Sequence, residues 1–173
     1  MVTLATPRRT QAERTAATTG ALLAAARERF ATDGYVAATL NAIAADAGVT
    51  KGALYHHFEG KEELFAAVYD REQQRLAAGA AAAGPALADV CLAYLAGLRE
   101  PGTRRIMLVD APLALSVTTL RSSPFVTLAE RALHGYRGDA AALAQLLHGA
   151  VREAALSEAP GAEAELRALL ERL

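Results

Sequence analysis

A short segment near residue 50 carries side chains whose chemistry suits a phosphate backbone and the edges of nucleobases. Thr50 and Lys51 open a predicted helix, and Tyr55 and His56 lie one turn further along it. The first turn of a helix offers unpaired backbone N–H groups and the positive end of the helix dipole, which favour a phosphate. Gly52 allows close approach of the backbone. In a major groove, such a helix places these side chains against phosphates and bases.

Two short helices joined by a tight turn are expected to position these side chains. The first spans residues 40–47 and the second 51–58, and Gly48 between them suits the positive φ of a sharp turn. Ala44 is small where the helices cross closely, and Leu54 packs the second helix against the first. This order of a small residue, a glycine and an apolar residue indicates a helix-turn-helix. Helical hairpins in enzymes occasionally show the same pattern.

Residues 12–70 resemble the DNA-binding domain of the TetR-like (tetracycline-repressor) family of transcriptional regulators. The motifs that carry the resemblance are FATDGY at 30–35, Thr39, IAADAGV at 43–49, KGALYHHF at 51–58 and KEELF at 61–65. Together they are highly specific, and they cover about a third of the chain.

The resemblance implies a homodimer that binds palindromic operators in double-stranded DNA and releases them when a small molecule enters the C-terminal half. It also implies DNA contacts, with Thr39 and Lys61 holding phosphates at helix N-termini. The DNA-facing positions implied in this way are Thr39, Thr50, Lys51, Gly52, Tyr55, His56 and Lys61.

Composition predicts an all-α fold and restricts the classes of function. Aromatic residues make up only 5% of the chain and tryptophan is absent, so alanine and leucine must provide most of the packing, and both favour helices. A net charge of −1 excludes a broadly basic nucleic-acid binder or a polybasic membrane binder. No membrane span and no signal peptide are expected, which fits a cytoplasmic protein.

Rival chemistries at cysteine and histidine are weaker than the DNA-binding interpretation. Cys91 is the single cysteine, which excludes an internal disulfide and a cysteine-cluster metal site. Its apolar neighbours favour a buried structural thiol over a redox sensor. Adjacent histidines such as His56 and His57 point about 100° apart on a helix, so they are rejected as a metal pair. The chain is therefore expected to need no cofactor and to be no enzyme.

The helical pattern divides the chain into four parts. A flexible arm is expected at 1–9, a helix-turn-helix DNA-binding domain at 10–60, a linking helix at 61–79 and a helical effector-binding and dimerisation domain at 80–173. Arg8 and Arg9 would make the arm basic.

Apolar stripes near the C-terminus are candidates for a dimer interface. On one predicted helix the stripe is formed by Leu143, Leu147, Ala150 and Ala154, and on the next by Leu166, Leu169 and Leu170. A twofold contact covers such stripes economically, and an operator with two half-sites favours it. An intramolecular core is the plainer alternative.

A small apolar effector is expected to bind inside the helices that span residues 85–148. Candidate lining residues are Tyr94, Leu98, Met107, Leu113 and Phe125, with Asp110 and His148 as polar possibilities. Such an apolar stripe also fits a plain core. A repressor without a small-molecule effector therefore stays open, as does, more remotely, an all-helical enzyme or ligand carrier.

Overall fold

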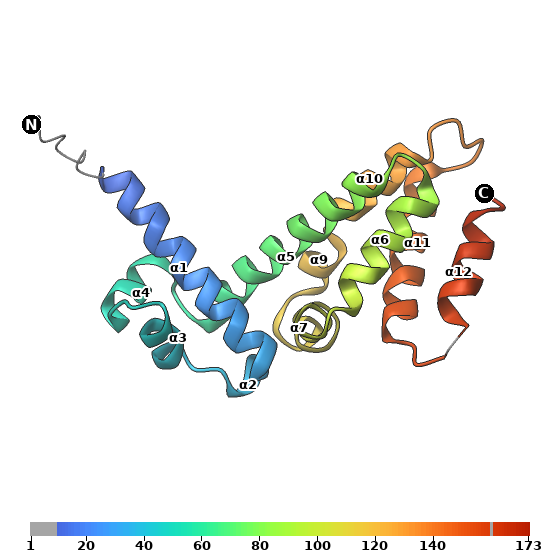
Figure 1. The fold of residues 1–173 in the computed structure, drawn as a ribbon. Helices are drawn as coiled ribbons and strands as arrows, with labels where there is room; N and C mark the ends of the chain where they lie inside the picture. The colour runs from blue at the N-terminus through green and yellow to red at the C-terminus, as the bar shows by residue number, and fades with distance from the viewer. Residues whose placement is uncertain (1–9, 160) are drawn as a thin grey trace, which may run out of the picture.

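Alanine- and leucine-rich segments, punctuated by glycine and proline, fold into an elongated array of helices (Figure 1). The computed structural model describes residues 10–159 and 161–173, and within these ranges every regular element is a helix. The all-α prediction is therefore confirmed for this part of the chain. The arm predicted at 1–9 lies outside the described residues.

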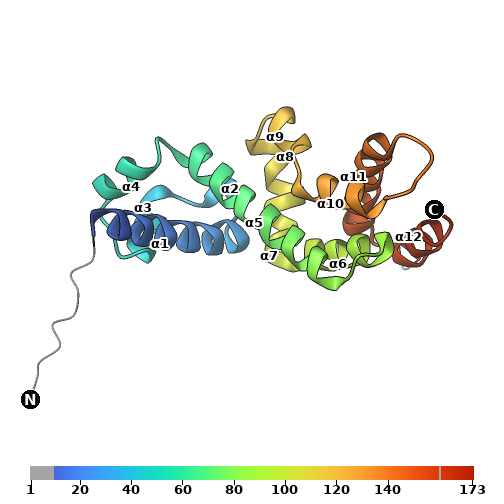
Figure 2. The same cartoon turned by 90° about the horizontal axis from the view of Figure 1, so that it is seen from above.

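The N-terminal end of the molecule consists of four helices grouped around the beginning of a fifth (Figures 1 and 2). Their bounds are α1, Gln11–Thr32; α2, Gly34–Ala37; α3, Leu40–Asp46; and α4, Lys51–His57. The long α5, Lys61–Ala83, leads from this group into the other end of the molecule. It extends four residues beyond the linking helix expected at 61–79.

The C-terminal end is a bundle in which α5, α6, α10 and α11 pack together, with α12 against α6 and α11 (Figure 1). The bounds are α6, Leu87–Arg99; α7, Pro101–Arg104; η1, Arg105–Asp110; α8, Ala111–Ala114; α9, Val117–Arg121; α10, Pro124–Ala132; α11, Ala140–Leu156; and α12, Ala162–Leu170. Here η1 is one turn of π-helix, a rare element that occurs frequently at functional sites.

Hydroxyl and carboxylate side chains start the helices that position the site. Thr10 and Glu13 form a reciprocal capping box at α1. The hydroxyl oxygens of Thr39 and Thr50 accept hydrogen bonds from the first turns of α3 and α4. The chain leaves α1 at Gly34, whose φ of +85° lies in the left-handed region that favours glycine.

Aromatic rings join α1, α2 and α5 in the N-terminal core. The ring of Phe65 on α5 lies 5.0 Å from that of Phe30 and 4.9 Å from that of Tyr35, both with edge-to-face geometry. Phe65 and Phe30 are fully buried. The start of α5 is therefore part of the core that supports the helix-turn-helix.

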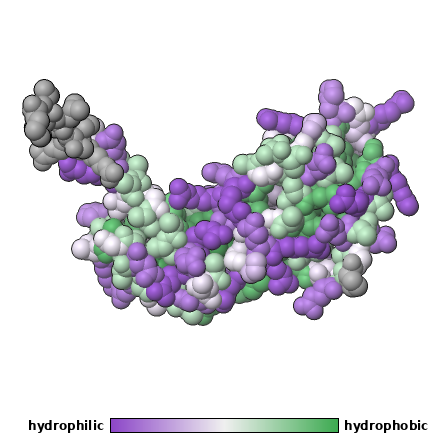
Figure 3. All heavy atoms as spheres, in the orientation of Figure 1, coloured by the Kyte–Doolittle hydropathy of each residue, from purple (hydrophilic) through white to green (hydrophobic). Residues whose placement is uncertain are grey.

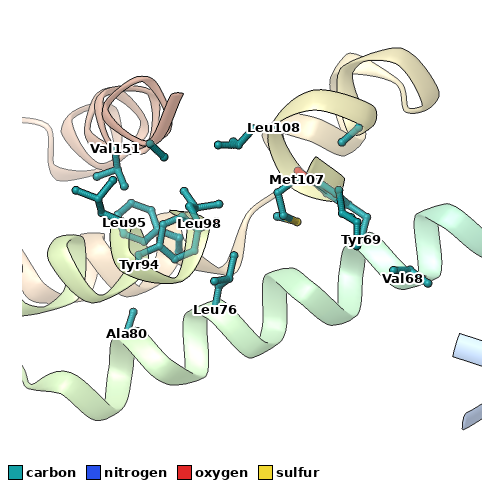
Figure 4. Packing of buried hydrophobic residues seen from close by; sticks show 14 of the residues in the cluster. Val68, Tyr69, Leu76, Ala80, Tyr94, Leu95, Leu98, Met107, Leu108 and Val151 are labelled. Carbon is teal, nitrogen blue, oxygen red and sulfur yellow. The ribbon is translucent and has the colours of Figure 1, made fainter. Parts of the chain in front are cut away.

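Buried side chains from α5, α6, η1 and α11 meet in the C-terminal core (Figure 4). Leu76 on α5 faces Leu98 and Tyr94 on α6, and Tyr69 on α5 lies beside Met107 on η1. On the face drawn in Figure 3, polar side chains cover much of the surface, and apolar surface is exposed over the end that holds α6, α11 and α12.

A buried carboxylate joins the two ends of the molecule. Glu72 on α5 accepts hydrogen bonds from Arg27 Nε on α1 at 2.7 Å, from Arg75 Nη2 at 3.1 Å and from Thr103 Oγ1 at 2.9 Å. Burial raises the pKa of Glu72, but these donors outweigh it and hold the pKa below its ordinary value. The carboxylate thus stays ionised and fixes α1, α5 and α7 to one another.

Candidate functional site

Helices α3 and α4 form the predicted helix-turn-helix. Gly48 between them has a φ of +68°, and Val49 N donates to the carbonyl oxygen of Ala44 at 3.0 Å. Ala44 and Leu54 are buried where the two helices meet. The turn geometry and the packing predicted from the sequence are therefore confirmed.

The outer face of α4 carries the side chains predicted to meet DNA. Lys51, Tyr55 and His56 are exposed, and Lys51 Nζ lies 5.8 Å from the centroid of the Tyr55 ring. The Thr50 hydroxyl oxygen accepts from Ala53 N at 3.1 Å, so its own proton stays available for another acceptor. A Cβ added at Gly52 would meet only Thr50 Oγ1, at 3.9 Å, so α4 presents open backbone there.

Contacts with α1 hold both short helices in place. The Thr19 hydroxyl is 3.0 Å from His57 Nδ1 on α4, and Arg29 Nη2 donates to Asp46 Oδ1 on α3 at 3.1 Å. The hydrogen bond from Arg29 lowers the pKa of Asp46, which keeps the carboxylate ionised. The two histidines of α4 therefore differ, because His57 anchors the helix and His56 faces solvent.

A surface hollow of about 470 Å³ lies between α1 and α4 and includes α1 residues that the helix-turn-helix pattern does not single out. It includes Arg14 and Thr18 on α1 together with His56 and His57 on α4. The α1 residues escape the motif because only the tertiary packing brings them beside α4.

Lys61 has a different environment from the phosphate contact that the resemblance implies. Its ammonium donates to the carbonyl oxygens of Tyr35, Val36 and Ala38 at 2.8, 3.1 and 3.2 Å, and lies 4.6 Å from the centroid of the Tyr35 ring. These acceptors match the three N–H bonds of an ammonium group. In this structure Lys61 therefore fixes the segment before Thr39, and its contact with a phosphate stays a prediction.

The predicted effector residues divide into buried and exposed groups. Tyr94, Leu98, Met107 and Phe125 are fully buried, and five surface hollows among the described residues are lined by other side chains. Leu113 is 73% exposed on α8, so its prediction as a lining residue is wrong in this structure.

Asp110 takes part in a junction between the two ends of the molecule. Its carboxylate accepts a hydrogen bond from Tyr35 N at 2.9 Å, and Arg105 Nε lies 3.7 Å from the same oxygen. Arg105 also donates to the carbonyl oxygens of Thr32 and Asp33 at 2.7 and 2.9 Å. Both ends of η1 are thus bonded to the junction of α1 and α2.

Three predicted effector residues do lie together. The Tyr94 and Phe125 ring centroids are 4.3 Å apart, and the His148 ring is 5.5 Å from Phe125 and 6.1 Å from Tyr94. Burial, with a smaller contribution from the charge of Arg152, lowers the pKa of His148 to about 4. His148 is therefore neutral at pH 7.

This lowered pKa predicts a loss of stability in mild acid. Between pH 6.5 and pH 4 the unfolded chain, in which the pKa of His148 is near 6.5, binds more protons than the folded chain. The free energy of unfolding therefore decreases as the pH is lowered through that window. Between pH 7 and pH 5, His148 should remove about 2 kcal/mol of the free energy of unfolding. Urea titrations of the parent and of His148→Gln measure the effect, and equal pH dependence of the two would contradict it.

Most residues of the predicted dimer interface are buried within the chain. Leu147, Ala154, Leu166 and Leu170 are buried because α11 packs against α6 and α10, and α12 against α6 and α11. Leu143 and Ala150 are half-buried, and Leu169 is 49% exposed. Four of the seven residues are therefore buried as the intramolecular alternative expects, and the dimer interface stays a prediction.

Two further findings concern the remaining sequence predictions. Cys91 is buried, and burial raises the pKa of its thiol to about 12, as expected of a structural thiol. Across residues 10–159 and 161–173, no helix is both long and apolar enough to cross a membrane.

Known proteins match the segment that holds the predicted helix-turn-helix. The family model described as "Bacterial regulatory proteins, tetR family" matches residues 22–68. The transcriptional activator FasR of Mycolicibacterium smegmatis is 48% identical over 60 residues, which are 35% of this chain and 27% of FasR. The transcriptional repressor BepR of Brucella suis is 47% identical over 64 residues, which are 37% of this chain and 30% of BepR. The matched segment thus spans less than a third of either protein.

A similarity over almost the whole chain comes from a solved structure. A TetR-family transcriptional regulator from Pectobacterium atrosepticum is 32% identical, with 95% of each chain covered and a TM-score of 0.71. Both its N-terminal and its C-terminal helices are therefore matched. This chain belongs to the TetR family of bacterial transcriptional regulators, with an N-terminal helix-turn-helix that binds DNA and a helical C-terminal domain.

Proposed function

We propose that the protein is a homodimeric repressor that leaves a palindromic operator when a small molecule binds its C-terminal half. The observation that carries the proposal is the outer face of α4, where Lys51, Tyr55 and His56 are exposed on a helix whose orientation is fixed by α1 and α3. Thr39 and Thr50 start α3 and α4 and would contact the backbone of the same DNA. Residues 10–60 would be the DNA-binding domain, and 80–173 would bind the effector and dimerise.

An exposed apolar face on α11 and α12 supports the dimer. Leu146 on α11 is 72% exposed, and Leu169 on α12 is 49% exposed. Beside them, Ala150, Leu166 and Leu169 help to line a surface groove of about 310 Å³. A twofold contact through this face buries these side chains and pairs two α4 helices, as half-sites about 34–36 Å apart require.

The π-helix η1 is the proposed route from the effector to the DNA. Arg152 Nη2 on α11 donates to the carbonyl oxygen of Met107 in the middle of η1 at 3.2 Å. The ends of η1 are bonded to the junction of α1 and α2 through Arg105 and Asp110. A ligand that binds one position of η1 more tightly than another would shift the separation of the two α4 helices.

Selection of bound sequences from random DNA tests the DNA-binding part of this function. We expect enrichment of a palindrome whose half-sites lie about one helical turn apart or a multiple of that distance. A small-molecule library screened against the selected DNA then tests release. Enrichment of no sequence, or of a site bound by one chain alone, would contradict the homodimeric repressor.

Lys51 is expected to contribute a salt-dependent contact to the DNA backbone. Each phosphate contact adds about 0.9 to the slope of log affinity against log salt, so Lys51→Ala should reduce the slope of a dimer by about 2. Titrations of fluorescent operator DNA at several salt concentrations measure the slope. Arg137→Ala removes an exposed charge between α10 and α11 and should leave the slope unchanged. An unchanged slope in Lys51→Ala would remove Lys51 from the interface.

A repressor without a small-molecule effector is the second candidate. The full burial of Tyr94, Leu98, Met107 and Phe125 favours it, because a closed interior offers a ligand no ready entry. In that case no compound of the library would change operator affinity, and DNA binding and dimerisation would be retained.

A further inference from the structure

Several polar atoms in the C-terminal half are buried without a hydrogen-bond partner among the described residues. They are Tyr69 Oη, Gln73 Oε1, Tyr94 Oη, Ser123 Oγ, His148 Nε2 and Arg152 Nη1. A buried polar group without a partner destabilises a protein, and native structures contain few of them. Within the group, Tyr69 lies close to Arg152 and Tyr94 lies close to Ser123, since each neighbour lowers the pKa of its tyrosine against the larger rise from burial.

These atoms come from neighbouring positions and not from scattered ones. Tyr69 and Gln73 lie four residues apart on α5, and His148 and Arg152 lie four residues apart on α11, so each pair shares one face of its helix. Tyr94 on α6 lies beside His148, with 6.1 Å between the ring centroids.

The remaining member, Ser123, is joined to the same region through Gln73 and Tyr94. Gln73 Nε2 donates to the carbonyl oxygen of Ser122 at 2.9 Å. Burial raises the pKa of Tyr94 to about 12, and the neighbouring Ser123 hydroxyl and the charge of Arg152 partly oppose that rise. In Figure 4, Tyr69 extends from α5 beside Met107, and Tyr94 extends from α6 beside Leu95 and Leu98.

The cluster carries a positive charge that no carboxylate neutralises among the described residues. Arg152 Nη2 donates to Met107 O at 3.2 Å, and Arg152 forms no ion pair there. The neighbouring His148 is neutral at pH 7, because its pKa is lowered to about 4 by burial and by Arg152. Arg152 is half-buried and its Nη1 atom is fully buried, and a guanidinium in such a position suits a carboxylate in particular.

An apolar wall lies directly beside these donors. The rings of Tyr94 and Phe125 are 4.3 Å apart, and Phe125 is also 5.5 Å from His148. Leu98 and Met107 are buried in the same core. Flat aromatic surfaces next to a cation suit a ligand that combines a planar apolar body with one negative charge.

We propose that the effector is a small aromatic carboxylate, whose carboxylate group binds Arg152 and the hydroxyl groups of Tyr69 and Tyr94. The proposal rests on the proposed function for its regulatory meaning, and it changes the expected effector from a purely apolar molecule to an anion with an apolar body. Because Arg152 is also bonded to η1 through Met107, the carboxylate would bind at the start of the route to the DNA.

Thermal unfolding of the full chain without DNA tests the ligand class. The probes are benzoate, phenylacetate and cinnamate, each matched with its neutral amide. At least one carboxylate should raise Tm in a concentration-dependent manner while its amide does not. The proposal is overturned if no carboxylate raises Tm, or if an amide binds as well as its carboxylate.

Variants locate the site. Arg152→Gln removes the charge but keeps a donor for Met107 O, and should weaken carboxylate binding by about tenfold or more. Arg104→Gln is the matched control, because Arg104 also donates to carbonyl oxygens, those of Ala155 and Leu156, and should leave binding unchanged. Tyr94→Phe removes one unpartnered hydroxyl with little change of shape, and should also weaken binding. Carboxylate binding that is unaffected by Arg152→Gln or, should that variant not fold, by Tyr94→Phe would contradict the site.

Operator titrations separate this inference from the proposed function. A carboxylate that binds through Arg152 but leaves operator affinity unchanged would support the ligand class and contradict effector release. A neutral compound that releases the operator would support the proposed function and overturn the carboxylate.

Discussion

Replacing Leu146 by glutamate is expected to separate the proposed dimer into single chains and to lower operator affinity by about 100-fold or more. Leu146 is 72% exposed on α11, and a twofold contact would bury two of the new carboxylates in an apolar interface. The loss of affinity follows because each chain would then hold one half-site alone. Size-exclusion chromatography with light scattering measures the mass, and operator titration measures the affinity.

Leu113→Glu is the matched control for this experiment. Leu113 is 73% exposed but lies on α8, away from α11 and α12, so the same change should leave the oligomeric state and the operator affinity unaltered. A dimer that survives Leu146→Glu would place the interface elsewhere. Dissociation by both variants would point to a general loss of structure and not to an interface.

Replacing Phe65 by alanine is expected to lower the free energy of unfolding by about 3–5 kcal/mol, the usual cost of removing a buried aromatic ring. Phe65 is fully buried and contacts the rings of Phe30 and Tyr35, so its loss opens a cavity where α1, α2 and α5 meet. Urea unfolding followed by circular dichroism measures the change.

Phe65→Leu is the control, because leucine fills much of the same volume and should cost less. Operator binding should fall with the folded fraction in Phe65→Ala. A loss below about 1 kcal/mol would show that the neighbouring rings close the cavity, since the cost depends on how far a site can collapse.

The helix-turn-helix could be predicted because its determinants are local. Thr39 and Thr50 as caps and Gly48 in the turn act within a few residues of where they stand in the sequence. Lys61 shows the limit of such reasoning. Its ammonium binds carbonyl oxygens more than twenty positions earlier in the chain, and no spacing within its own helix indicates that contact.

The C-terminal half is harder to predict, because an apolar stripe on a helix does not indicate whether other helices of the same chain cover it or leave it exposed. Leu147 and Leu169 both belong to apolar stripes, yet Leu147 is buried within the chain and Leu169 is half exposed. The irregular stretch through η1 adds to this, because a π-helical turn interrupts the 3.6-residue repeat on which face assignments depend. Leu113, just beyond that turn, is exposed although it was assigned to the interior.

The bonds from Arg105 to the carbonyl oxygens of Thr32 and Asp33 have a consequence for building hybrid regulators. Every residue carries a backbone carbonyl, so these bonds do not depend on which side chains stand at positions 32 and 33. Position 34 favours glycine, because its φ of +85° lies in the left-handed region and a Cβ there would displace the Arg105 guanidinium. Helices α1–α4 of another regulator could thus replace those of this chain, and redirect it to a new operator, provided that the graft keeps an arginine at position 27 for Glu72 and a glycine at position 34.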